Sequence, residues 1–179
     1  MRQMMKQKTD IKVATKELLN KYGITQIPID IESLAVQAGA VLSYEPFKEE
    51  LSGVLVKEND RTVIGVNSTH PKNRQRFTIA HELGHLFLQH QGEIFVDHVI
   101  SRRDKKSSLA VDWQEIEANK FAAELLMPED QLLEKAQFLQ ENNNEMTAIA
   151  LLTQLAKDFQ VSTQAMEIRL TNLGIFMPQ

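Results

Sequence analysis

Two histidines four residues apart, His81 and His85, enclose Glu82 in the run His-Glu-Leu-Gly-His. If this run lies on a helix, residues four apart face the same side, so both imidazoles can bind one metal ion. Glu82 then projects beside the metal, where it can accept a proton from a bound water molecule. The residue types and their spacing predict metal-assisted hydrolysis of an amide bond, with His81 and His85 as metal ligands and Glu82 as general base.

A third ligand is expected from the next helix, which offers Glu115 and Glu117. Glu115 shares a face with Asn119 and small apolar residues, which suits packing against the metal-binding helix. Glu117 shares a face with Lys120 and Glu124, a charge pattern typical of a solvated surface. We therefore expect Glu115 to bind the metal and Glu117 to face water. Asn119, one turn after Glu115, is expected to hydrogen-bond a ligand histidine.

The ligand types limit the kind of metal site. The sequence contains no cysteine, which excludes disulfides, thiolate catalysis and Cys-rich zinc sites. Two imidazoles and one carboxylate suit a single Zn²⁺ ion, and Mn²⁺ or iron accept the same ligands. Three protein ligands leave one coordination position open, as in catalytic zinc sites, whereas structural sites are usually closed by four.

Four other side chains are weaker candidates for the site. His90 would lie near the end of the helix and away from the ligand face, so we expect it at the surface. His70 and His98 fall in expected loops. Either of these two, or Tyr44, has a group that can stabilise a tetrahedral oxyanion, and the sequence does not choose among them.

Charge and hydropathy exclude several classes of protein. The 179 residues carry a net charge of -4, which argues against binding of nucleic acid or anionic membranes through bulk positive charge. The basic first 21 residues are interpreted as the solvated face of a helix. No apolar run approaches the roughly 20 residues that a membrane span needs, and no signal-like segment follows Met1. We expect a cytoplasmic protein with no membrane partner.

The apolar pattern predicts an α+β fold, mostly helical, with a small three-stranded antiparallel sheet. Helices are expected over residues 10–22, 29–39, 72–90, 113–127, 128 to a break at 141–144, 147–159 and 162–172. Strands are expected over residues 41–47, 51–56 and 61–67, the last two forming a hairpin. Residues 91–111 are expected to form a long excursion with one short strand.

The expected elements divide into two parts. Residues 1–135 are predicted to form a metallopeptidase domain with N-terminal helices, and residues 136–179 a C-terminal helical segment packed on it. The last two helices resemble a helix-turn-helix. Residues 162–172 offer one arginine against one glutamate and few other side chains that contact bases, so we expect no direct binding of nucleic acid. Packing on the metal domain, or docking of a repressor, is the favoured use of these helices.

Two separated segments resemble the ImmA/IrrE family of metallopeptidases. The first comprises residues 63–67 and 74–80, which lead into His-Glu-Leu-Gly-His. The second, residues 115–128, reads Glu-x-x-Ala-Asn-x-Phe-Ala-Ala-x-Leu-Leu-Met-Pro. The resemblance covers about residues 30 to 130 and implies a zinc endopeptidase of the gluzincin type. It implies that His81, His85 and Glu115 hold the metal and that Glu82 is the catalytic base.

The same resemblance implies a substrate. Members of the family are typically encoded on mobile elements or in stress-response loci, and they relieve repression by cutting or inactivating a helix-turn-helix repressor. An extended substrate segment is expected to add to a sheet edge formed by residues 51–56 or 61–67. The alternative is a non-proteolytic regulatory protein that binds a repressor or DNA and uses its metal only for folding. A toxin-antitoxin component is a third option, which nothing beyond the small size supports.

Overall fold

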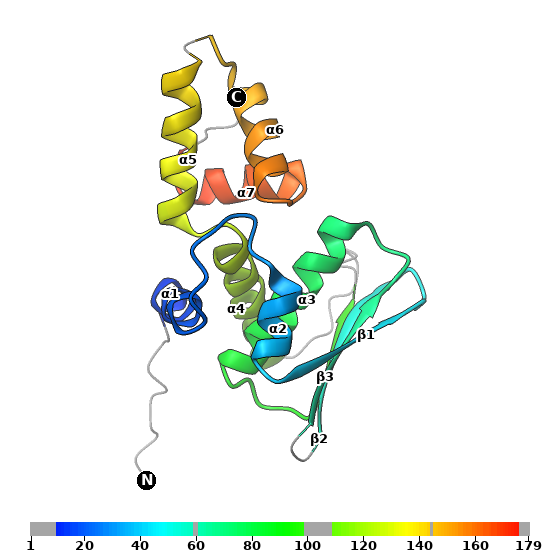
Figure 1. Cartoon of the computed structure of the whole chain (residues 1–179). Helices are drawn as coiled ribbons and strands as arrows, with labels where there is room; N and C mark the ends of the chain where they lie inside the picture. Colours follow the sequence, from blue (N-terminus) through cyan, green and yellow to red (C-terminus); the bar gives the residue numbers. More distant parts are fainter. Residues whose placement is uncertain (1–9, 59–60, 99–108, 144, 176–179) are drawn as a thin grey trace.

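The computed structural model describes residues 10–58, 61–98, 109–143 and 145–175, which form an α+β fold (Figure 1). The helices are α1 (Ile11–Lys21), α2 (Ile31–Gln37), α3 (Lys72–Phe87), α4 (Leu109–Leu126), α5 (Glu129–Asn142), α6 (Ala148–Asp158) and α7 (Thr163–Asn172). The strands are β1 (Ala40–Glu45), β2 (Leu51–Glu58), β3 (Arg61–Asn67) and β4 (Ile94–His98). The α+β class and the mostly helical content are as expected.

The sheet differs from the expected three-stranded antiparallel arrangement. It has four strands in the order β1-β3-β2-β4, and β1 runs parallel to β3 while the other neighbours are antiparallel. The β2–β3 hairpin was predicted, but hydropathy does not reveal on which side β1 joins it. Because β2 and β3 are paired on both sides, neither offers the expected open edge. Within the described part of the chain, the edges are β1 and β4.

Helix α3 connects the sheet to α4. Its apolar side chains Ile79 and Leu83 are buried in one core with Leu55 and Ile64 of the sheet and Phe121 of α4. Apolar burial of this kind is the main stabilising contribution to the fold. The core therefore fixes α3 between the sheet and α4.

The last three helices gather at one end of the molecule (Figure 1). The turn between α6 and α7 contacts the first half of α3, where Asn73 Nδ2 donates to the Val161 carbonyl at 3.0 Å and Arg76 Nε to the Gln160 carbonyl at 3.2 Å. Arg169 of α7 forms an ion pair with Glu124 of α4. Helix α5 runs continuously through residue 135, and the division there into two parts stays a prediction.

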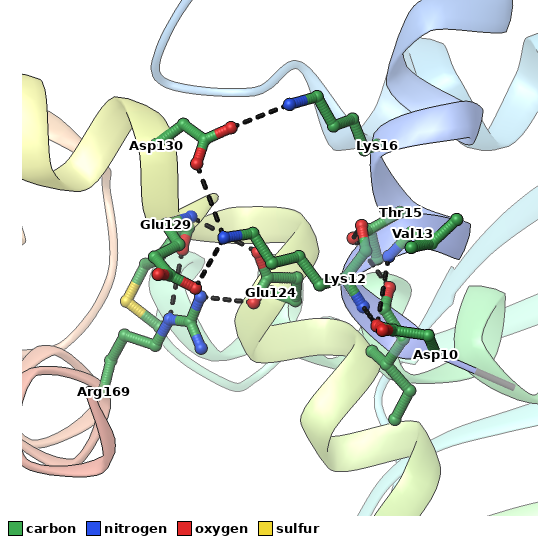
Figure 2. A network of polar contacts seen from close by, with 11 residues as sticks. Asp10, Lys12, Val13, Thr15, Lys16, Glu124, Glu129, Asp130 and Arg169 are labelled. Carbon is green, nitrogen blue, oxygen red and sulfur yellow. Dashed lines mark hydrogen bonds and ion pairs between the residues drawn. The ribbon is translucent and has the colours of Figure 1, made fainter. Parts of the chain in front are cut away.

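Helix α1 is joined to the beginning of α5 by charged side chains (Figure 2). Asp10 caps α1 by accepting from the backbone amides of residues 12 and 13. Lys12 lies 2.9 Å from Glu129, and Lys16 lies 2.9 Å from Asp130. The basic N-terminal helix is thus partly paired with the acidic first turn of α5, rather than only solvated.

Within the described residues, no helix has both the length and the apolar character needed to cross a lipid bilayer.

Candidate metal centre

The structure brings the three expected ligands together. The Nε2 atoms of His81 and His85 lie 3.1 Å apart on α3. The carboxylate of Glu115 on α4 lies between them, with Oε2 3.2 Å from His81 Nε2 and Oε1 3.3 Å from His85 Nε2. Both histidines are buried, while the Glu115 side chain is 35% exposed. One side of the cluster is therefore accessible to a ligand or substrate.

A close approach of α3 and α4 makes this convergence possible. Gly84 lies between the two histidines along α3, and a Cβ built on it would lie 3.0 Å from the Cα atom and 3.2 Å from the carbonyl oxygen of Ala118. Such distances are shorter than ordinary van der Waals contacts. The absence of a side chain at residue 84 therefore sets the helix separation at which Glu115 reaches the imidazoles.

Each ligand histidine has a further partner on its outer nitrogen. Asn119 Oδ1 lies 3.2 Å from His81 Nδ1, so Asn119 is placed where a histidine-orienting residue was expected. His90 Nδ1 lies 2.9 Å from His85 Nδ1. Both rings thus direct Nε2 towards the cluster and Nδ1 towards a polar side chain, an arrangement that fixes the orientation of metal-binding imidazoles.

The expected surface position of His90 is wrong, because the residue is only 5% exposed. The prediction assumed that the helix continues to residue 90, whereas α3 ends at Phe87. Gln89 then takes a positive φ of 54°, and the amide of His90 donates to the His85 carbonyl at 3.1 Å. This reversal folds His90 back over the preceding turn. Nothing in the sequence indicated that Gln89, which is not a glycine, adopts a left-handed backbone conformation.

The expected exposure of Glu117 is also wrong. Its side chain is 18% exposed, and Oε2 lies 3.4 Å from His90 Nε2. Glu124, on the same face of α4, is buried against Arg169 of α7. Helical periodicity identified a charged stripe correctly but could not show that the reversal after α3 and the helix α7 cover it.

Glu82 is fully buried, and neither carboxylate oxygen has a hydrogen-bond partner among the described residues. Burial raises the pKa of Glu82 to about 8, although the neighbouring His81 opposes this change. A buried carboxyl group without a donor is unfavourable for folding. Its position beside the ligand cluster fits a group that exchanges protons near a cation.

The cluster has the electrostatics of a site for a cation. Burial by itself would raise the pKa of Glu115, but the hydrogen bonds to His81 and His85 and the charges of these rings together outweigh this effect and lower the pKa to about 2. Burial lowers the pKa of His85. Burial by itself would lower the pKa of His81, but the hydrogen bond to Glu115 and the charges of Asp97, Glu82 and Glu115 together raise it. Two imidazole nitrogens and an ionised carboxylate form a donor set that suits zinc.

Strand β4 contributes two residues that were not predicted from the sequence. The ring of Phe95 lies 4.4 Å from that of His85, measured between centroids. Two positions further along the strand, Asp97 contributes to raising the pKa of His81, and burial and the charge of Glu115 raise the pKa of Asp97 itself. Residues two apart share one face of a strand. The signal was therefore the short strand expected within residues 91–111, but its pairing with β2 was not predictable.

The structure does not bring the proposed oxyanion-stabilising groups Tyr44 and His70 to the cluster. The Tyr44 hydroxyl on β1 donates to Glu32 of α2 at 2.7 Å. His70 precedes α3, and its Nε2 lies 3.2 Å from the Glu49 carbonyl oxygen. His98 is the last residue of β4, and its side chain lies outside the described part of the structure.

Comparisons with known proteins agree with the fold and the cluster. Residues 35–171 match the IrrE N-terminal-like domain of the M78 peptidases. A search of curated proteins gave no match. Among solved structures, a chain described as a Mycobacterium tuberculosis transcriptional regulator shares the fold, with a TM-score of 0.62 and 17% sequence identity. That match covers 90% of this chain and 46% of the other, so this chain spans about half the length of that protein.

The family match extends over most of the chain and includes both helices that supply the cluster. We conclude that the chain belongs to the M78 metallopeptidase family with an IrrE N-terminal-like domain.

Proposed function

We propose that the chain is a zinc-dependent, site-specific endopeptidase in which His81, His85 and Glu115 hold one ion and Glu82 is the catalytic base. The observation that carries this proposal is the convergence of two Nε2 atoms and one carboxylate beside a buried glutamate without a hydrogen-bond partner among the described residues. The same donor set accepts Mn²⁺.

Each residue has a distinct role in the proposed reaction. A zinc ion held by His81, His85 and Glu115 would supply a Lewis acid for the scissile carbonyl and for water. Glu82 accepts the proton of the attacking water and later donates it to the leaving nitrogen. A neighbouring cation favours the ionised form of this carboxyl group, which is the form that accepts a proton. Asn119 holds the His81 ring by its Nδ1 atom.

Strand β4 is the proposed docking edge for an extended substrate segment. It pairs with β2 on one side, and its residues Phe95 and Asp97 lie beside the ligand cluster. A peptide that adds to an open strand edge is held by main-chain hydrogen bonds. The sequence led us to expect substrate addition at β2 or β3, but both strands lie inside the sheet.

The edge is tested with a peptide substrate that carries backbone N-methyl groups, one position at a time. In a strand, successive amides point to opposite sides, so every second methyl group should abolish cleavage and those between should be tolerated. Tolerance at every position would exclude strand addition without any change to the protein.

The proposed substrate is a helix-turn-helix transcriptional repressor, whose cleavage relieves repression. The support is the resemblance to the ImmA/IrrE family and the described role of the similar Mycobacterium tuberculosis protein as a transcriptional regulator. Direct DNA reading by α7 is not favoured, because its single arginine, Arg169, is paired with Glu124 and its residues Met166 and Leu170 are buried.

The test is a Glu82→Gln variant, incubated with a candidate repressor with and without chelator. We expect the variant to bind zinc as the parent does and to lose cleavage, because only the proton acceptor is removed. Glu134→Gln, at an exposed position on α5, is the matched control and should cleave normally. If Glu82→Gln relieved repression as well as the parent, the alternative of a non-proteolytic repressor-binding protein would replace the proposal.

A further inference from the structure

The His85 ring has a close polar neighbour at each nitrogen, and these neighbours form a continuous line. Its Nε2 lies 3.1 Å from His81 Nε2, and its Nδ1 lies 2.9 Å from His90 Nδ1. The other nitrogen of His90 lies 3.4 Å from Glu117 Oε2. We propose that His90 and Glu117 are positioning residues that fix the tautomer and orientation of His85 for metal binding. This inference rests on the metal site of the proposed function.

With both rings neutral, the contacts among His85, His90 and Glu117 fit one assignment of the protons. A histidine that binds a metal through Nε2 has no proton there, so neutral His85 carries its proton on Nδ1. That N–H must donate to Nδ1 of His90, which therefore has to be an unprotonated acceptor. Neutral His90 then carries its proton on Nε2, where Glu117 Oε2 is placed to accept it. Glu117 thus selects the tautomer of His90, and His90 selects that of His85.

The backbone holds His90 in a fixed relation to His85. The amide of His90 donates to the carbonyl of His85 at 3.1 Å, so the two residues are joined through both main chain and side chain. Lys57 of β2 reaches the same place, with Nζ 3.4 Å from the carbonyl oxygens of both residues. The position of His90 is therefore set by the end of α3 and by the sheet.

Each of the two ligand histidines has an acceptor for its Nδ1 proton. His81 has the amide oxygen of Asn119 as acceptor for its Nδ1 proton, and His85 has the ring nitrogen of His90. Without that acceptor, His85 would bury an N–H group with no partner or turn its ring away from the cluster. Loss of such an outer partner typically weakens metal affinity by about 10- to 100-fold.

The experiment measures zinc affinity by competition with a chromophoric chelator, independently of cleavage. His90→Phe keeps a ring of similar size but removes the acceptor, and we expect its affinity to fall by about 10- to 100-fold. His90→Asn places an oxygen near the position of Nδ1 and should restore most of the loss. A role in packing alone predicts the opposite order, because phenylalanine fills the buried space better than asparagine.

Glu117 is tested in the same way. Glu117→Gln retains an oxygen that can accept from His90 and should bind zinc nearly as well as the parent, whereas Glu117→Leu should bind more weakly. His70→Phe is the matched control for His90→Phe, because it also replaces a histidine by phenylalanine but lies just before the beginning of α3 rather than after its end. We expect no change in its zinc affinity.

Nitrogen-15 NMR of the zinc-loaded parent gives a second readout that needs no variant. The inference requires His85 to be protonated on Nδ1 and His90 on Nε2. A His90 ring protonated on Nδ1, or undiminished zinc affinity of folded His90→Phe, would overturn the positioning role while leaving the metal site intact. Failure of the parent to bind zinc would overturn both the metal site and this inference.

Discussion

At the scale of single residues, Glu82 shows how the site differs from an ordinary core. The side chain is fully buried and has no hydrogen-bond partner among the described residues. Gly53 of β2 leaves space beside it, since a Cβ there would lie 2.3 Å from Thr78 Cγ2 and 3.3 Å from Glu82 Oε1. A glycine on the facing strand thus allows the carboxyl group to fit next to the cluster.

The pKa of Glu82 predicts how the stability of the metal-free protein depends on pH. Burial raises this pKa to about 8 from the ordinary value of 4.5, so the folded state holds the proton more tightly than the unfolded state. The resulting stabilisation is complete below pH 4.5 and is lost as the pH rises towards 8. Glu82→Gln has no charge to lose at this position. We therefore expect the parent to become less stable relative to the variant as the pH rises.

The measurement is urea unfolding of both proteins in the presence of chelator at pH 4.5 and pH 8. Other titrating groups are common to the two proteins, so the difference between their unfolding free energies reports residue 82 and its coupling to neighbours such as His81 and Lys57. A difference that does not vary with pH would contradict the raised pKa.

The sequence predicted those site residues whose placement depends only on spacing within a single helix, either α3 or α4. His81, Glu82 and His85 follow from the four-residue spacing, and Glu115 and Asn119 from the small apolar face of the next helix. The environment of His90 and Glu117 depends on how the chain reverses after α3, and that of Asp97 on strand pairing. Such contacts join segments far apart in the chain, and local periodicity does not encode them.

At the scale of elements, the separation of α3 and α4 controls whether the third ligand reaches the histidines. Gly84→Ala would place a Cβ 3.0 Å from the backbone of Ala118. Alanine is favoured over glycine within a helix by about 1 kcal/mol. We nevertheless expect weaker zinc binding, because the helices must move apart and withdraw Glu115. Zinc titration with parallel circular dichroism checks this prediction, and unchanged affinity at unchanged helicity would contradict it.

The ion pair between Arg169 and Glu124 fastens α7 to α4. Both side chains are nearly buried, at 11% and 10% exposure, and Arg169 Nε also donates to the Met127 carbonyl. Arg169→Ala leaves a buried carboxylate without its partner, which typically costs about 3 to 5 kcal/mol. We expect a lower midpoint of urea unfolding. Lys16→Ala, which removes an exposed ion pair with Asp130, is the control and should have a much smaller effect.

The elements themselves were more predictable than their arrangement. The helices around the cluster and the β2–β3 hairpin followed from apolar spacing and from turn residues. The parallel pairing of β1 with β3 did not, because the same alternating pattern fits either neighbour and either direction. Strand β4 was expected only as a short strand of unknown partner. The open edge was expected at β2 or β3, but both strands are internal, and the edge beside the cluster is β4.

At the scale of the whole molecule, the cluster joins two parts of the core that are distant in sequence. The histidines belong to the helix that packs on the sheet, and Glu115 belongs to the helix that leads to the C-terminal segment. A metal ion bound at this junction stabilises the folded state relative to the unfolded chain. We expect free zinc at one hundred times its dissociation constant to add about 2.7 kcal/mol to the unfolding free energy.

Calorimetry with zinc and with chelator tests this coupling. Glu82→Gln should keep the full zinc-dependent increase, and Glu115→Gln should lose most of it, because Glu115 is a proposed ligand and Glu82 is not. Equal increases in the two variants would show that Glu115 does not hold the ion.

Helix α3 is bound to the C-terminal helices near its beginning and presents the histidines nearer its end. Arg76, which holds the turn between α6 and α7, precedes His81 by five residues, or about 8 Å along a helix that rises about 1.5 Å per residue. In the proposed peptidase, a substrate that contacts the turn between α6 and α7 would therefore be held close to the cluster along α3. Such a contact would favour cleavage at a fixed distance from the bound segment, whatever the residues around the bond.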